Sequence, residues 1–352
     1  MLRVNHAIVH VCDFESCVNV FSTSEVNLID RKTKSYVGKT CRKALGSIEN
    51  RRGTFLEGSG FAAKLNEYFA SGLNFVDFSV EVANFLAQEL GHMENPESVD
   101  ILVADFEDEA PKPSSDASEE ELEASYQAQG KRYVGIFFLP VQPAFMHEAG
   151  QGELGPCVDI ARHHAILPKP SQKLSTYCLI ERESLQILFV DKEREISGEQ
   201  CLLIPDKLLE CESEASTKEV VDTAVRIAEE VATEHGANAA VAASKAKAYV
   251  NQNADENEYL APWDMADEVF EDENMKQAFD AALTAEHVPE KVPVKKSAAT
   301  RLARNHKIRT NTGIEITFPS EYSDNPDFIE FLSMPNGLIS IELKNISNIE
   351  NR

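Results

Sequence analysis

The sequence predicts an α+β protein: a mostly antiparallel N-terminal sheet with covering helices, then an acidic helical region and a small C-terminal β-meander. Three observations support this. Short apolar runs of strand length fill the first two hundred positions, helical periodicity begins near Ser216, and short strands return over the last forty residues. With 352 residues, 43% of them hydrophobic, the chain is long enough for two or three domains.

The N-terminal part starts with strands and continues with a helix pair. Residues 2–12 alternate loosely between apolar and polar side chains and predict a strand, with residues 18–21 as its partner. Residues 61–91 place apolar side chains at helical spacing, with a break near Gly72 and a stop at Gly91. We expect two helices here that pack on the sheet.

A second group of strands follows. VDILVADF (99–106) predicts a strand, and the Pro-, Ser- and acid-rich segment 107–130 predicts a disordered insertion. YVGIFFLPV (133–141) is apolar enough for a buried central strand, whereas glycine-rich AGQGELG (149–155) predicts a loop. Further strands are expected over 157–161, 176–190 with a hairpin turn at Ser184, and 201–205.

The helical region begins with a capping box, in which Ser216 accepts at the helix start and Glu219 reaches back. The Ala-rich stretch 237–251 has apolar faces that favour self-association, because soluble chains seldom leave such faces bare. Finally, GIEITFP, FIEFLSM and LISIELKNI alternate with turn signals and predict the meander. The expected division is 1–210 for the α+β domain, 213–288 for the helical region, 289–305 for a basic linker and 306–352 for the meander.

The charge of the chain is strongly segregated. The formal net charge is −25, yet residues 31–52 and residues 291–309 each carry +7, which leaves −39 on the rest. Long cations can follow a phosphate backbone without reading bases, so the segment 291–309 is the leading candidate for DNA contact. Its cations are Lys291, Lys295, Lys296, Arg301, Arg304, Lys307 and Arg309.

A second candidate patch for DNA lies in residues 31–52, which we call the first basic island. Its cations are Arg31, Lys32, Lys34, Lys39, Arg42 and Lys43. The alternative interpretation of this island is an ordinary solvated helix face. For the C-terminal segment, the alternative is that its cations neutralise the acidic helices at 253–290 of the same molecule, where twelve Asp or Glu stand against one Lys.

No motif indicates catalysis, a cofactor or a metal. Gly38-Lys39-Thr40 resembles the end of a phosphate-binding loop, but Thr33 occupies the position of the required earlier glycine. His163, His164, Asp159 and Cys157 lack the spaced pairs of a zinc site. The seven cysteines are odd in number and lie in apolar runs, which favours reduced, buried thiols. No nucleophile motif is present, so we expect a protein without enzymatic activity.

The C-terminal residues carry a family resemblance. HKIRTNTGIEITFPSEY followed by FIEFLSMPNGLISIELKNI resembles the C-terminal signature of the bacterial 37-kDa nucleoid-associated protein family. The resemblance implies a cytoplasmic, non-enzymatic protein of the bacterial nucleoid that binds DNA. No apolar run of membrane-spanning length and no signal-peptide pattern occurs, which agrees with that location.

Three functions remain open from the sequence. The first is a DNA-binding nucleoid protein that contacts double-stranded DNA without sequence specificity and has protein partners in the nucleoid. The second is an acidic protein–protein interaction module that acts on a basic or DNA-binding partner. The third is an enzyme whose site is assembled from distant residues, which a buried carboxylate cluster beside a lysine would support.

Overall fold

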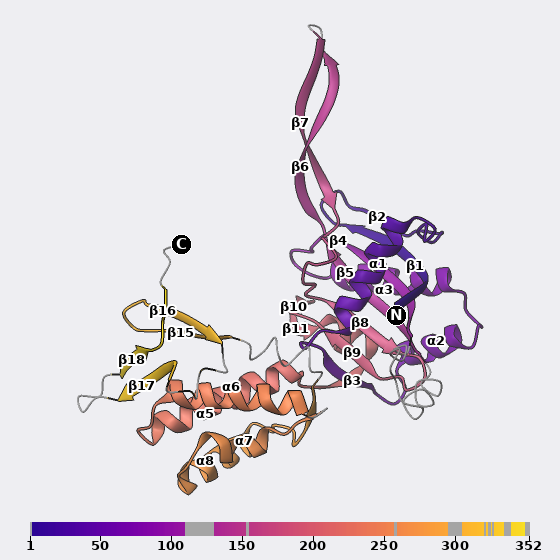
Figure 1. Cartoon of the computed structure of the whole chain (residues 1–352). Coiled ribbons are helices and arrows are strands. Elements are labelled where there is room, and N and C mark those ends of the chain that lie inside the picture. The colour runs from indigo at the N-terminus through magenta and orange to yellow at the C-terminus, as the bar shows by residue number, and fades with distance from the viewer. Residues whose placement is uncertain are drawn as a thin grey trace, which may run out of the picture. The chain divides into compact units, whose positions relative to one another are not determined.

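The computed structural model describes residues 2–109, 130–152, 155–256, 259–294, 305–319, 322, 325, 327–333 and 339–348. Two compact units make up the chain, one ending at Glu214 and the other beginning at Ala215. Figure 1 shows the elements of both units along the chain. Each unit has its own hydrophobic core.

The first unit is organised around one eight-stranded antiparallel sheet with the order β12-β3-β9-β8-β5-β4-β1-β2. Long β4 and β5 lie near its centre and pair over ten residues each. The strands are β1 Leu2–Asp13, β2 Val18–Val20, β3 Arg51–Phe55, β4 Val99–Asp108, β5 Lys131–Pro140, β8 Tyr177–Glu181, β9 Ile187–Val190 and β12 Cys211–Glu214. The expected hairpins at 2–21 and 176–190 are confirmed.

Helices cover both faces of this sheet. In β4, Ile101 and Val103 point toward one core, and Leu102 and Ala104 point toward the other, as the two-residue period of a strand requires. We call the side of Ile101 and Val103 the first face and the side of Leu102 and Ala104 the second face. Two α-helices and a π-helix pack on the first face, and one helix packs on the second. These are α1 Arg31–Leu45 on the second face and α2 Gly60–Phe69, α3 Phe75–Gly91 and η1 Leu203–Leu209 on the first. The break predicted near Gly72 is therefore confirmed.

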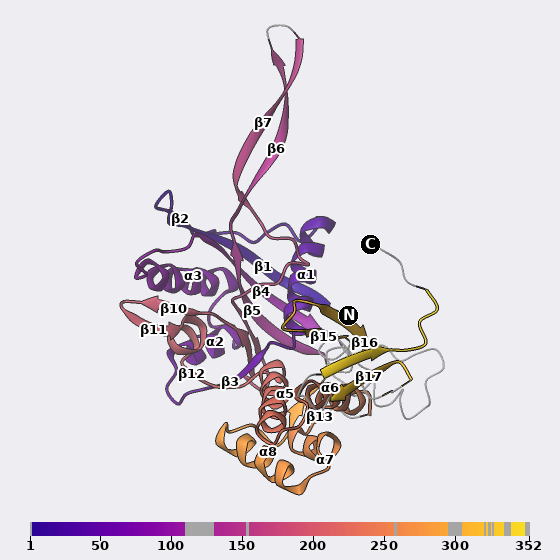
Figure 2. The same cartoon turned by 90° about the vertical axis from the view of Figure 1, so that its left-hand side faces the viewer.

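A long two-stranded arm leaves the sheet after β5. It consists of β6 Gln142–Gly152 and β7 Gly155–Ile166, which pair in register from Ala144 and His163 to Gly152 and Gly155. Figures 1 and 2 show the arm projecting from the sheet. The loop predicted for 149–155 was wrong for residues 149–152 and for Gly155, because backbone pairing between β6 and β7 continues as far as Gly152 and Gly155. Residues 153 and 154 lie outside the described residues.

The strand predicted at 201–205 is only partly present. β10 Glu193–Ile196 pairs with β11 Glu199–Leu202, but the next residues turn into η1. Two carboxylates accept backbone N–H groups at this point: Asp206 accepts from Leu202 at 2.7 Å, and Asp191 accepts from Ile204 at 2.7 Å. These bonds stabilise a helical turn where apolar composition alone indicates a strand.

The disordered insertion predicted for 107–130 does not include Glu107 and Asp108, which belong to β4. β4 continues through Asp108, and pairs there with Lys131 at the start of β5. Residues 110–129, which hold most of the expected insertion, lie outside the described residues.

The second unit contains the predicted helices. The capping box is confirmed: the Ser216 hydroxyl accepts from the Glu219 N–H, and the Glu219 carboxylate accepts from the Ser216 N–H. Ala242, Ala243 and Ala246 are buried inside this unit, so the Ala-rich stretch gives no ground for self-association. The elements are α5 Thr217–Glu234, α6 Ala239–Glu256, β13 Tyr259–Leu260, η2 Pro262–Asp264, α7 Met265–Val269, α8 Glu273–Ala285 and β14 Val292–Pro293.

The C-terminal strands form two hairpins, which confirms the α+β class. β15 Asn305–Arg309 pairs with β16 Glu315–Pro319, and β17 Ile329–Ser333 pairs with β18 Ile339–Leu343. The rings of Phe318 and Phe331, one from each hairpin, lie 6.5 Å apart. Among the described helices, none combines the length and the apolar character needed to cross a membrane.

Candidate nucleic-acid interface

Residues 31–45 of the first basic island form helix α1, and Arg51 and Arg52 of the same island lie on β3. The N-cap of α1 is Asp30, whose carboxylate accepts from the Thr33 N–H at 2.8 Å and from the Thr33 hydroxyl at 2.9 Å. These two hydrogen bonds lower the pKa of Asp30. The helix ends at Gly46, whose N–H donates to the Arg42 carbonyl. Local capping therefore fixes both ends of a helix of about 22 Å.

The faces of α1 are sharply different. The buried residues Val37, Cys41 and Ala44 pack on the sheet in the core of the second face. All six cations of the candidate patch are exposed. At about 100° per residue, five of them lie within an arc of about 120° that is centred opposite the buried stripe, and Lys34 lies beside that arc. The spacing thus places these six cations on the solvent-facing side of α1.

The exposed face of α1 carries positive charge that no described carboxylate balances through an ion pair. Arg31 and Lys32 lie in the first turn of α1, which contains no acidic residue, so they oppose the helix dipole. Within the described part of the chain, no ion pair joins any of the six cations to a carboxylate, whereas Lys64, Lys131 and Lys192 elsewhere in the first unit each contact a glutamate. The helix face therefore presents uncompensated positive charge.

The segment after β7 extends this face. The Tyr36 hydroxyl donates to the Pro168 carbonyl at 2.9 Å, and the Lys43 ammonium donates to the Ser171 carbonyl. Pro170 borders a shallow hollow beside α1, whose other lining residues are Arg31, Lys32, Ser35, Tyr36 and Lys39. Exposed Lys169 lies in the same segment. This neighbour could not be predicted from the sequence, because more than 120 residues separate it from α1.

The C-terminal candidate segment is described only at its two ends. Lys291 is exposed just before β14, and Arg309 is exposed at the end of β15, 3.9 Å from Glu315. Lys307 lies on β15 opposite Thr317. Lys295, Lys296, Arg301 and Arg304 lie outside the described residues.

The acidic helices use other partners within the described residues. Lys276 contacts Asp267 at 2.8 Å and Glu273 at 3.3 Å, and Arg226 contacts Glu286. These are the ion pairs formed there by carboxylates of the 253–290 region, and none of them involves Lys291 or Arg309.

The residues considered for nucleotide or metal binding lie in a helix and along a strand. Gly38-Lys39-Thr40 lies inside α1, not in a loop. Cys157, Asp159 and His163 are spread along one face of β7, and His163 lies 4.0 Å from Glu148. Among the described residues no His, Cys, Asp and Glu side chains gather as metal ligands. Cys17 and Cys157 are exposed, contrary to the prediction that the thiols are buried.

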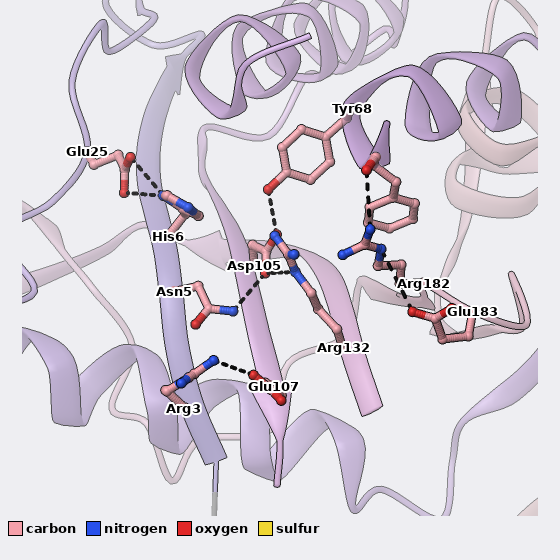
Figure 3. A network of polar contacts seen from close by, with 11 residues as sticks. Arg3, Asn5, His6, Glu25, Tyr68, Asp105, Glu107, Arg132, Arg182 and Glu183 are labelled. Atoms are coloured by element: carbon pink, nitrogen blue, oxygen red, sulfur yellow. Dashed lines mark hydrogen bonds and ion pairs between the residues drawn. The ribbon is translucent and has the colours of Figure 1, made fainter. Parts of the chain in front are cut away.

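A buried carboxylate does occur, at the end of the sheet where β4 and β5 meet α2. Asp105 is fully buried and accepts from Arg132, Tyr68 and Asn5, as Figure 3 shows. Burial and the contact with Asp105 raise the pKa of Tyr68, and the same carboxylate raises the pKa of Arg132. Every oxygen of Asp105 is thus occupied by donors. The network holds α2 to the sheet and leaves no free general base.

Comparison with protein families decides the relationship. A family model described as "Nucleoid-associated protein YejK" matches residues 8–350, which is nearly the whole chain. The chain belongs to this nucleoid-associated family. A comparison with curated proteins gives no match.

The extent of the match connects both units to the family. The C-terminal residues that carry the resemblance in the sequence form only part of the second unit, whereas the family match also includes α1 and the eight-stranded sheet. The resemblance noted in the sequence is therefore confirmed over the whole fold of this nucleoid-associated protein.

Proposed function

We propose that this nucleoid-associated protein binds double-stranded DNA without sequence specificity, through phosphate contacts. The observation that carries the proposal is the exposed face of α1, where six cations have no described carboxylate partner. The C-terminal cations from Lys291 to Arg309 form the second and longer contact. Both sites use Lys and Arg, which act on any sequence because they contact the backbone.

Geometry supports α1 as a phosphate-binding surface. A helix of about 22 Å is longer than the major groove of DNA is wide, about 12 Å, so cations along one face can reach phosphates on both sides of the groove. Arg31 and Lys32 are placed against the helix dipole, at a cost of about 0.3–1 kcal/mol each. A bound phosphate at this end would offset that cost, because helix N-termini attract anions.

The strongly negative total charge limits the affinity. With −25 overall, the chain repels DNA at a distance, and binding depends on how the two basic surfaces face the duplex. We therefore expect binding that weakens steeply with salt. The competing function, an acidic module for a basic protein partner, predicts no direct binding to DNA even at low salt.

The test is a salt series on a random-sequence duplex with three variants of the full chain. One replaces Arg31, Lys32, Lys39 and Arg42 with Gln, and one replaces Lys295, Lys296, Arg301 and Arg304 with Gln. The matched control replaces Lys64, Lys173 and Lys192 with Gln; these cations are at least partly exposed, and each contacts a glutamate.

Each lost phosphate contact should lower the slope of log affinity against log salt by about 0.9. We expect a clear loss of slope in both site variants and little change in the control, because the slope counts phosphate contacts and the control lysines are paired with glutamates outside both sites. Equal slopes in control and site variants would contradict these sites. Absence of binding by the unmodified chain at low salt would contradict DNA binding itself.

A further inference from the structure

We infer that the β6–β7 arm is a self-association element, whose apolar face packs against the same face of a second copy of the chain. The arm is a two-stranded ribbon that projects from the sheet of the first unit (Figures 1 and 2). A ribbon of two strands is marginally stable in water unless a hydrophobic face is covered or further strands are added. The arm therefore needs a partner surface.

The register separates the side chains of the arm into two faces. Residues directly opposite each other in an antiparallel pair lie on the same face, and the face changes at every step. One face carries the opposed pairs Phe145 with Arg162, His147 with Ile160, and Ala149 with Val158. We call this set the apolar face of the arm.

The apolar face lies in solvent. Phe145 is 73% exposed, Ile160 75% and Val158 70%. These are large values for three neighbouring apolar side chains, since monomeric proteins rarely leave contiguous apolar patches open. Nothing in the described part of the first unit covers them.

The opposite face of the arm carries both of its described carboxylates, together with Ala161 and Met146, which is 47% exposed. Glu148 and Asp159 are directly opposed there, and His163 lies 4.0 Å from Glu148. Two like charges at opposed positions destabilise a ribbon, so these carboxylates favour solvent on that face. The arm is thus amphipathic, and only one of its faces is suited to contact.

Charge identifies a protein partner and not DNA. The described arm residues hold Glu148 and Asp159 against Arg162, so the arm is net negative and offers a single strong cation. Phosphate recognition requires several cations. The apolar face, by contrast, has no carboxylate, so two copies of a chain with charge −25 meet there without opposing carboxylates.

Symmetry favours a second copy. A two-fold axis near the middle pair of the apolar face, His147 with Ile160, places Phe145 of one arm against the Val158 end of the other and sets Ile160 near its own counterpart, so the contact is the same on both copies. Arg162 lies near the base of the face, where a long side chain extends to solvent. Two stacked ribbons then form a small sandwich that covers both apolar faces.

The contact is small. Eleven residues at about 3.3 Å each give an arm of about 36 Å, and a ribbon about 10 Å wide offers about 360 Å² per copy. The total of about 700 Å² is below the 1,200 Å² or more of stable complexes. We therefore expect a weak dimer whose population rises with concentration.

The first experiment measures mass against concentration by sedimentation equilibrium. The unmodified full chain should pass from monomer toward dimer, and Phe145→Ser with Ile160→Ser should shift the dissociation constant upward at least tenfold. The matched control is Ile29→Ser, which removes an apolar side chain that is 93% exposed elsewhere on the same unit. A monomer at every concentration, or an equal effect of the control, would overturn the inference.

The second experiment uses cysteine crosslinking to identify which face of the arm forms the contact, and it leaves Phe145, Val158 and Ile160 in place. In a background with Cys17→Ser and Cys157→Ser, which removes the exposed thiols, Ala149→Cys places one thiol on the apolar face. A short bismaleimide should join two copies through this position. In a Cys17→Ser chain, the native Cys157 on the opposite face should not be joined. The reverse pattern would assign the contact to the opposite face and overturn the inference.

Discussion

Arg132 binds Asp105 in a bidentate manner: its Nε lies 2.8 Å from one carboxylate oxygen and its Nη2 lies 2.6 Å from the other. The carboxylate is fully buried, whereas the guanidinium is about one-third exposed. Two parallel hydrogen bonds of this kind combine charge with fixed geometry. The pair joins β4 and β5 at the end of the sheet beside α2.

Replacing Arg132 with Ala should therefore destabilise the first unit by about 3–5 kcal/mol, because it leaves the carboxyl group of Asp105 buried and without its main partner. Urea unfolding monitored by circular dichroism measures the change. Arg3→Ala is the control, since the Arg3–Glu107 pair lies at the surface and should contribute less than about 1 kcal/mol. Similar losses in both variants would show that burial of Asp105 does not govern the network.

Gly135 lies in the centre of β5, where the ring of Phe137 folds back over it. A Cβ at this position would be 2.6 Å from the Phe137 ring and 3.1 Å from Leu179. Gly135→Ala should cost about 1–3 kcal/mol through overpacking. The double variant with Phe137→Leu should lose less than the sum of the two single changes, as measured by thermal unfolding. Additive losses would mean that the clash with the Phe137 ring is not what makes Gly135→Ala destabilising.

Ser216 begins α5 and satisfies two backbone groups together with Glu219. Ser216→Ala should lower the stability of the second unit by about 1 kcal/mol, and Ser216→Asp should retain most of it, because Asp also caps helices. Native-state hydrogen exchange in α5 reads out this unit separately from the sheet. Faster exchange in the Asp variant than in the Ala variant would contradict the role of the cap.

Asp100, at the start of β4, gives the fold a pH dependence. Burial, with the charge of Asp13, raises the pKa of Asp100 from 3.8 to about 6. The folded state therefore binds a proton more tightly than the unfolded state. This contribution to stability is complete below pH 3.8 and is lost as pH rises to about 6.

Asp100→Asn removes that dependence. Between pH 4 and pH 6.5, the stability of the unmodified chain should fall by about 1–2 kcal/mol relative to the variant, and the difference should stay constant at higher pH. Urea titrations of both chains over this range give the difference directly. A parallel pH dependence of the two chains would show that Asp100 titrates normally.

Much of the fold follows from local patterns. The hairpin of β8 and β9 and the capping box at Ser216 depend on residues within a few positions of each other, so the sequence is sufficient to predict them. The η1 turn was missed because Asp191, eleven residues upstream of Leu202, supplies one of the hydrogen bonds that stabilise it. In the arm, the strand predicted over 157–161 is confirmed as part of β7, whereas β6 was missed, because glycines that indicate a loop are also compatible with a ribbon.

The candidate interface was predictable in one respect. The spacing of Lys39, Arg42 and Lys43 places them on one side of a helix, which the structure shows to face solvent. That Pro168 and Pro170 border the same surface could not be predicted, since this contact depends on the path of the arm between β5 and β8. Tertiary neighbours of this kind carry no local signal.

The place of β3 in the sheet has a consequence for synthesis. β3 lies between β9 and β12, so the strand completed at Phe55 finds its partners only after Val190 and Glu214 have been made. At about 5–20 residues per second, a growing chain carries β3 unpaired for roughly ten seconds or more. Arg51 and Arg52 place two charges in this short strand, which discourages pairing with neighbouring nascent chains during the delay.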